Sequence, residues 1–182
     1  EVFVSGDYES ATDNLSLEVA ERILSRILSN CGNVPLSLRA YALRSLRAEI
    51  SYRSGVVNQQ RGQLMGNFLS FPLLCIQNYL AFKFSIPRSV PIAINGDDIV
   101  FRATPVEYQR WSSFVGDAGL TLSVGKTMVD ASIYSLNSCF FRATGGRPRE
   151  IPVIRTSMLI PGDGLPGSYE FSRFIRGWKG HA

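Results

Sequence analysis

The sequence has 182 residues, of which 45% are hydrophobic and 19% charged, enough apolar content for one folded domain. This composition excludes a disordered or fibrous chain. Nineteen Lys and Arg against 15 Asp and Glu give a net charge of +4, a surplus that suits a polyanionic partner without identifying one. The longest apolar stretch, 68–84, is interrupted by polar residues and falls short of a membrane span, and no signal peptide is evident, so we predict a soluble chain.

The three cysteines, Cys31, Cys75 and Cys139, are widely spaced and include no Cys-x-x-Cys pair. That spacing indicates neither a disulfide framework nor a zinc site. It is typical of a protein in a reducing intracellular compartment.

The first half of the chain alternates between strand and helix patterns. Residues 1–5 are typical of a strand, and apolar residues at helical spacing over 15–28 predict an amphipathic helix. A second, basic helix is predicted over 35–49, followed by a strand or hairpin arm over 50–57. Residues 68–84 are apolar on nearly every face, which predicts a helix buried all round.

The second half contains a clear hairpin signal. The apolar runs 92–95 and 99–101 flank Gly96-Asp97-Asp98. A helix is then predicted over 106–118, and strands over 120–124 and 133–141. This order favours an α+β fold in which helices cover one face of a mostly antiparallel sheet.

Three aspartates occur where strands end or turn. Asp7 lies just beyond the first strand, and Asp97 and Asp98 lie at the hairpin tip. If the strands are neighbours, a spacing of about 4.8 Å would bring the carboxylates together. Such a cluster could hold two Mg²⁺ ions, which together activate a hydroxyl and stabilise a leaving pyrophosphate. The alternative is a hairpin turn chosen for backbone reasons alone.

Four segments together resemble motifs A to D of viral RNA-dependent RNA polymerases. They are Gly6-Asp7-Tyr8-Glu9-Ser10-Ala11-Thr12-Asp13, residues 62–78, the Gly-Asp-Asp (GDD) sequence at 96–98, and Gly125-Lys126. The details look most like the ourmia-like and narna-like viruses. The resemblance implies a polymerase palm, the central part of a right-hand polymerase, that replicates a positive-strand RNA virus genome. The segment is expected to be a fragment of the full enzyme.

The resemblance implies roles for the acidic residues. Asp7 and Asp97 would be the main ligands of two Mg²⁺ ions, for which Mn²⁺ can substitute, and Asp98 a supporting carboxylate. Asp13 would accept a hydrogen bond from the ribose 2′-hydroxyl and so favour ribonucleotides. Lys126 would be the motif D general acid that protonates the leaving pyrophosphate. Gly125-Lys126-Thr127 is not a P-loop, because Leu120 occupies the place of the first glycine.

Motif B carries the remaining nucleotide contacts. Gly62, Gly66 and Asn67 resemble the loop whose backbone approaches template and nucleotide closely. Ser70 resembles the hydroxyl residue near the ribose. Related polymerases have an Asn four positions later, but Leu74 stands there, and the nearest amide along the helix is Asn78. Asn78 is therefore the candidate for that ribose contact.

Residues 134–141 resemble motif E, a hairpin that supports the primer strand. We expect the palm to cover 1–145, with part of the fingers within 31–60, and a basic tail toward the thumb over 146–182. The region that follows the hairpin contains basic residues suited to RNA phosphates: Arg142, Arg147, Arg149, Arg155, Arg173, Arg176 and Lys179. His181 beside the end has no assigned role.

The expected partners are an RNA template and primer, ribonucleoside triphosphates, and the missing fingers and thumb of the same polypeptide, in the host cytoplasm. Three alternatives remain open: a catalytically inactive RNA-binding remnant, a reverse transcriptase-like polymerase, and a two-metal nuclease. The intact aspartates argue against the first. Asp13, where reverse transcriptases carry an aromatic steric gate, argues against the second. The motif B loop and helix argue against the third.

Overall fold

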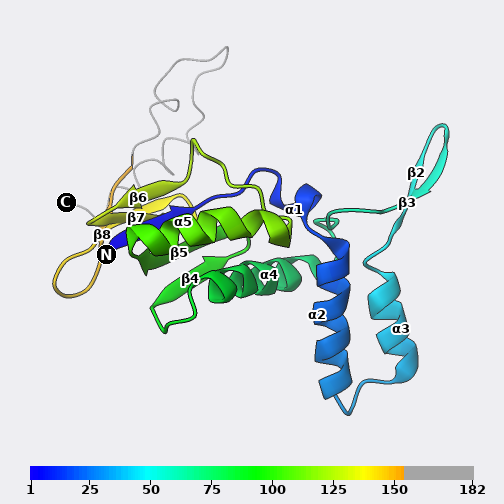
Figure 1. Ribbon diagram of the computed structural model, residues 1–182. Coiled ribbons are helices and arrows are strands. Elements are labelled where there is room, and N and C mark those ends of the chain that lie inside the picture. Colours follow the sequence, from blue (N-terminus) through cyan, green and yellow to red (C-terminus); the bar gives the residue numbers. More distant parts are fainter. Residues whose placement is uncertain (154–182) are drawn as a thin grey trace, which may run out of the picture.

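The computed structural model describes residues 1–153, and its centre is a four-stranded antiparallel sheet (Figure 1). The strand order is β4 (Ile92–Asn95), β5 (Asp98–Ala103), β1 (Val2–Gly6) and β6 (Met128–Asp130). β1 is therefore an inner strand, and its partners come from distant parts of the chain. The predicted α+β class with a mostly antiparallel sheet is confirmed.

Two helices cover one face of this sheet, α4 (Ser70–Ser85) and α5 (Pro105–Phe114). The core between them and the sheet centres on Trp111, Phe82 and Phe101, which are at most 1% exposed. The Phe101 ring lies 5.0 Å from both the Phe82 and the Trp111 ring, and aromatic pairs at this separation add to the stabilisation that burial provides. A capping box of Thr104 and Glu107 begins α5 and fixes where the helix leaves β5.

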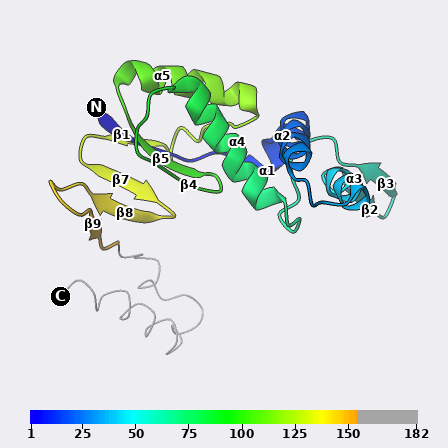
Figure 2. The same cartoon turned by 90° about the horizontal axis from the view of Figure 1, so that it is seen from below.

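The other face of the sheet is partly covered by a smaller antiparallel sheet of β7 (Ile133–Leu136), β8 (Cys139–Arg142) and β9 (Arg149–Ile151), best seen in Figure 2. Its β7 strand crosses β1, since Ser135 N donates a hydrogen bond of 2.8 Å to Ser5 Oγ. The Phe3 and Tyr134 rings pack 4.9 Å apart beside it. The hairpin predicted from the resemblance to motif E is present.

A second body of helices lies beyond the end of the sheet. The short α1 (Ala11–Asn14) leads into α2 (Leu17–Asn30), which packs on α3 (Leu36–Arg44) around a separate small core. The hairpin β2 (Glu49–Tyr52) and β3 (Gly55–Asn58) extends away from the body, with every residue exposed. α3 ends at Arg44, earlier than the predicted helix over 35–49.

Two predictions about the elements are wrong. Residues 120–124 do not form a strand: after α5 and the 3₁₀ turn η1 (Val115–Ala118), the chain makes only one isolated bridge, Tyr8 to Leu122, before it turns. α4 is also not buried all round, because the sheet and helices within residues 1–153 leave one side of it uncovered. Phe71 and Phe84 are 57% and 74% exposed.

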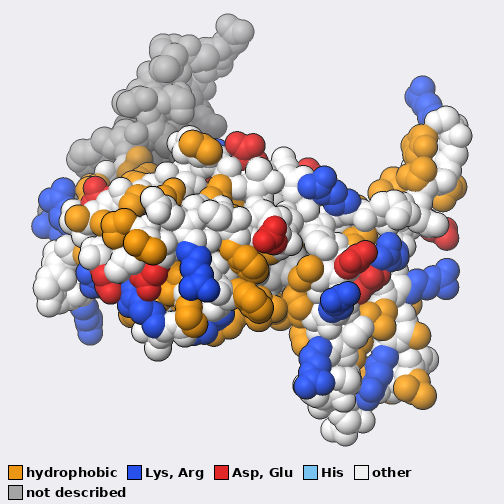
Figure 3. Space-filling view, in the orientation of Figure 1, with side chains coloured by type: hydrophobic (Ala, Val, Ile, Leu, Met, Phe, Trp, Pro, Cys, Tyr) orange, Lys and Arg blue, Asp and Glu red, His pale blue; other side chains and the backbone are white. Residues whose placement is uncertain are grey.

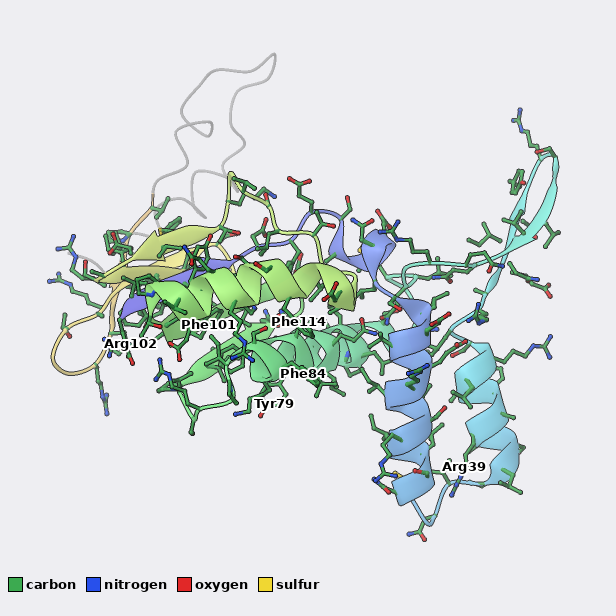
Figure 4. The ribbon with its side chains drawn as sticks, viewed as in Figure 1. Arg39, Tyr79, Phe84, Phe101, Arg102 and Phe114 are labelled. Atoms are coloured by element: carbon green, nitrogen blue, oxygen red, sulfur yellow. The ribbon has the colours of Figure 1, made fainter. Side chains whose placement is uncertain are left out.

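The hydrophobic side chains visible over α4 in Figure 3 belong to this uncovered face. Figure 4 shows Phe84 beside Phe114 of α5, and the two rings are stacked with centroids 5.4 Å apart. None of the helices within residues 1–153 is both long and apolar enough to cross a bilayer.

Candidate active site

The aspartates singled out by the sequence lie at one end of the central sheet. Gly6 is paired with Ile99 in the antiparallel register of β1 and β5. Asp7, just after β1, therefore lies at the same edge as Asp98, which begins β5. Asp97 lies in the tight turn that joins β4 to β5. The spacing of neighbouring strands thus gathers these residues from distant positions in the chain.

Lys126 joins the same edge from a third segment. Its Nζ lies 3.4 Å from Asp7 Oδ2. The turn that carries it is attached to the Asp7 backbone, because Ser123 N donates to Asp7 O at 2.9 Å. Within the described residues, no donor hydrogen-bonds to Asp7 Oδ2 although that atom is buried. This carboxylate oxygen has free capacity to bind a cation.

The electrostatics of this edge indicate excess negative charge. Burial raises the pKa of Asp98, and the nearby charges of Asp97 and Asp7 raise it further, against a hydrogen bond from Asn137 N and the charge of Lys126. A bound cation would relieve this repulsion. The carboxylates therefore fit Mg²⁺, which binds through a few protein oxygens and takes its other ligands from water or phosphate. Residues 1–153 contain no preformed group of three or more candidate ligands.

The turn of a neighbouring hairpin contacts the same carboxylates. Asn137 and Ser138 both have positive φ, 54° and 60°, at the turn between β7 and β8. Asn137 N donates to Asp98 Oδ2 at 3.1 Å, and Asn95 Nδ2 donates to Asn137 Oδ1 at 2.6 Å. This contact was not predicted from the sequence, where the turn-favouring pair Asn137-Ser138 is the local signal for it.

Asn78 does not lie where a ribose could reach it, and that prediction is corrected. The residue is fully buried and both ends of its amide are hydrogen-bonded within the protein. The Tyr8 hydroxyl donates to Asn78 Oδ1 at 2.8 Å, and Asn78 Nδ2 donates to Gly96 O at 3.2 Å. Burial, aided by the charge of Asp97, raises the pKa of Tyr8, so its hydroxyl stays a donor.

Gly62 is required by the protein's own backbone. Its φ is +75°, and a Cβ there would lie 2.6 Å from Thr12 O and 2.8 Å from Asp13 O. Gly62 N donates to Leu15 O, and Gln63 N donates to Thr12 O. The motif B loop is thereby fastened against α1. Gly66, in contrast, has open space around it, which leaves room for a ligand to approach.

The other two motif B residues also have internal partners. Asn67 Nδ2 donates to Ser45 O at 2.8 Å, and Asn67 Oδ1 accepts from Leu69 N, so this residue ties α3 to the start of α4. Ser70 is 4% exposed and donates to Leu64 O at 2.6 Å. The Ser70 proton is thus engaged within the protein, while its oxygen can still accept a hydrogen bond, so the predicted ribose contact of Ser70 stays a prediction.

Asp13 remains available for a ligand. It lies in α1, in the segment that follows β1 and Asp7, and is exposed. The main chain that carries it is fixed, because Asp13 N donates to Ser10 O and the Asp13 backbone packs on Gly62. Asp13 is therefore a solvent-facing carboxylate on a backbone that contacts with Ser10 and Gly62 hold in place.

Comparison with known proteins gives a sequence relative and several structural ones. No family model matches the chain. The RNA-dependent RNA polymerase of Ourmia melon virus is 33% identical over 180 residues, covering 86% of this chain and 21% of that protein. The chain thus spans about a fifth of the length of this relative.

Two solved structures share the fold at low sequence identity. One is an insertion-loop deletion mutant of the RNA-dependent RNA polymerase of a human picobirnavirus. It is 13% identical to this chain, with a TM-score of 0.59, and the match covers 78% of this chain and 29% of the polymerase chain. The other is an apo telomerase from Candida tropicalis. It is 10% identical to this chain, with a TM-score of 0.58, and the match covers 82% of this chain and 35% of the telomerase chain.

These findings confirm the resemblance to viral RNA-dependent RNA polymerases and the palm-type fold. They do not test the predicted division at residue 145 or the roles of the site residues. Of the predicted basic region, Arg142, Arg147 and Arg149 are described and exposed. Arg155, Arg173, Arg176, Lys179 and His181 lie outside the described residues.

Proposed function

From its similarity to a viral RNA-dependent RNA polymerase, we propose that this chain carries the palm active site of such an enzyme and joins ribonucleotides on an RNA template. The observation that carries the proposal is the meeting of Asp7, Asp97, Asp98 and Lys126 at one sheet edge in a relative of that polymerase. The biological setting would be replication of a positive-strand RNA virus genome in the host cytoplasm.

Asp7 and Asp97 would hold two Mg²⁺ or Mn²⁺ ions, with Asp98 as a supporting carboxylate. Such a pair of ions activates the primer hydroxyl and stabilises charge on the leaving pyrophosphate. Lys126, 3.4 Å from Asp7, is within reach of the same place and would give its ammonium proton to the departing pyrophosphate oxygen. When no substrate is bound, its charge offsets that of the Asp7 carboxylate.

The exposed Asp13 carboxylate would accept a hydrogen bond from the ribose 2′-hydroxyl. The open space around Gly66 would admit the template or nucleotide. The exposed arginines that follow β7 would contact RNA phosphates independently of sequence. The palm would extend to residue 145, with part of the fingers within 31–60, and 146–182 would lead toward the thumb. The rest of the fingers and the thumb would come from the same polypeptide.

A reverse transcriptase-like polymerase is the second candidate, because a telomerase shares this fold at nearly the same TM-score. The fold alone therefore does not decide between ribonucleotide and deoxyribonucleotide. Asp13 favours the ribonucleotide, since an acidic acceptor at that place gains a hydrogen bond only from a sugar with a 2′-hydroxyl.

The decisive experiment is Mg²⁺- or Mn²⁺-dependent extension of an RNA primer on an RNA template by the full-length protein. Asp97→Asn should reduce the rate by several orders of magnitude and leave RNA affinity nearly unchanged, because it removes charge from the metal site. Glu49→Gln, which removes an exposed carboxylate from the distant β2 strand, is the control and should extend normally. RNA binding without extension in the unaltered protein would instead identify an inactive remnant.

A further inference from the structure

One face of α4 holds the turn that precedes Asp97. Phe71, Leu74, Cys75 and Asn78 follow the i, i+3, i+4, i+7 spacing of a single helix face, and all four approach Gly96. Gly96 N donates to Cys75 Sγ at 3.2 Å, and Gly96 O accepts from Asn78 Nδ2 at 3.2 Å. Both backbone polar groups of Gly96 are therefore bonded to α4.

The amide of Asn78 also reaches the segment that carries Asp7. Tyr8, the residue after Asp7, is 3% exposed and donates its hydroxyl to Asn78 Oδ1 at 2.8 Å. The orientation of the amide is determined by chemistry, because the Gly96 carbonyl can only accept and must face the NH₂ group. One side chain thus links the residue after Asp7 to the residue before Asp97.

The sheet itself does not provide this link. The pairing of β1 with β5 places Asp98 beside Asp7, but Asp97 lies in the turn, beyond the last paired residues of β4 and β5. The position of Asp97 relative to Asp7 therefore depends on what holds the turn. Of the polar contacts that Gly96 makes within residues 1–153, only the one to Asn78 continues to the β1 side.

We propose that Asn78 is a positioning residue that sets the separation of the Asp7 and Asp97 carboxylates for cation binding. This inference rests on the proposed function, in which these two aspartates hold the metal ions. Residues that orient metal ligands typically change metal affinity or activity by about 10-fold to 100-fold when they are replaced. Asn78 acts through Tyr8 and Gly96 and touches neither metal nor substrate.

The test compares Asn78→Leu with Gln77→Met in the full-length protein. Gln77 is the neighbouring buried amide of α4, 1% exposed, and it bonds to Ser16 O on the other side of the helix. Mn²⁺ binding without RNA, measured by electron paramagnetic resonance, should weaken about 10-fold to 100-fold for Asn78→Leu. It should stay unchanged for Gln77→Met. In primer extension, Asn78→Leu should lower kcat with little change in KM for primer and template.

A double variant separates positioning from simple stability. Asn78→Leu leaves the Tyr8 hydroxyl buried without its Asn78 partner, and adding Tyr8→Phe removes that hydroxyl, so the double variant should regain part of the lost thermal stability. Its Mn²⁺ affinity should stay low, because the bond to Gly96 is still absent. Recovery of Mn²⁺ affinity together with stability would overturn the proposal, as would wild-type affinity in Asn78→Leu.

Two further comparisons separate a failure of the Asn78 inference from a failure of the proposed polymerase function. If Asn78→Leu fails to fold, Tyr8→Phe alone removes one bond and should still weaken Mn²⁺ binding, and unchanged binding would refute the inference. If the unaltered protein binds Mn²⁺ but does not extend primers, polymerisation fails as the function, while the Mn²⁺ comparison still decides the role of Asn78. Absence of Mn²⁺ binding in the unaltered protein would refute both.

Discussion

Gly62→Ala should damage the protein far more than Gly66→Ala, although both glycines belong to the same loop. At Gly62 the backbone has a φ of +75°, and a methyl group would lie 2.6 Å from Thr12 O and 2.8 Å from Asp13 O. Neither contact can be relieved by rotating a flexible side chain, because both atoms are backbone. At Gly66 nothing lies within 4 Å of the same methyl group.

The expected cost at Gly62 has two parts. Placing a side chain in the left-handed region costs about 1–2 kcal/mol. Forcing a methyl group into packed backbone costs about 1–3 kcal/mol more. The sum, about 2–5 kcal/mol, corresponds to a fall in the midpoint of thermal unfolding of about 4–20 °C for a domain of this size. Gly66→Ala should stay within about 0.5 kcal/mol of the unaltered protein, as exposed substitutions usually do.

Thermal unfolding of the two variants provides the stability test, and nucleotide selection provides a second one. Because the added methyl group would push on the backbone of Asp13, Gly62→Ala should also weaken the preference for ribonucleotides over deoxyribonucleotides in the molecules that remain folded. Equal thermal shifts for Gly62→Ala and Gly66→Ala would refute this reasoning, since it attributes the larger cost at Gly62 to its positive φ and its crowded surroundings.

Two other changes have definite expected outcomes. Asp13→Ala should reduce the preference for ribonucleotides by about 10-fold or more, because a hydrogen bond to a charged acceptor is lost. Asp13→Asn keeps an acceptor, so its preference for ribonucleotides should fall by a smaller factor. Unchanged nucleotide selection by Asp13→Ala, measured by single-nucleotide incorporation, would remove Asp13 from this role. Glu107→Gln should destabilise the protein by up to about 1 kcal/mol near neutral pH, because it removes the charge from the ion pair with Arg88 and leaves a weaker, neutral acceptor for Thr104 N in the capping box. Because Arg88 and the Thr104 cap lower the pKa of Glu107 from 4.5 to about 2, its contribution is complete above pH 4.5 and is lost as the pH falls toward 2. The midpoints of thermal unfolding of the unaltered protein and Glu107→Gln should therefore converge at low pH. A difference between them that stays constant with pH would contradict this role of Glu107.

Elements with strong local signals were predicted correctly from the sequence. The hairpin around Gly96 and the helices over 15–28 and 106–118 have turn residues and apolar spacing that indicate one structure. The strand predicted over 120–124 failed because alternation alone does not supply a partner: this segment bonds only briefly to Asp7 and Glu9 before it turns. The exposure of one face of α4 could not be predicted either, since composition gives the apolar content of a helix but not the number of neighbours that cover it.

The candidate site was predicted in part for the same reason. The positions of Asp7, Asp97, Asp98 and Lys126 followed from strand ends, turns and the family resemblance. The partners of Asn78 and Ser70 could not be predicted, because an amide or a hydroxyl on a helix can equally face a ligand or a buried backbone group. The arrangement of α4 against the Gly96 turn decides this for Asn78, and the path of the loop that carries Leu64 decides it for Ser70.

The position of β1 inside the sheet has a consequence for how the site forms during synthesis. Asp7 leaves the ribosome before its partners, because Thr127, which follows Lys126 and bonds to the Asp7 backbone, is 120 positions later in the chain. The strand partners of β1 are also distant, since Val2 pairs with Ala103 and Phe3 with Asp130. Pairings this remote form slowly, because the closure of a long loop comes before any gain from contact. The nascent chain should therefore hold its acidic residues apart until nearly all of the described segment has been made, and cation binding should appear only with that last step of folding.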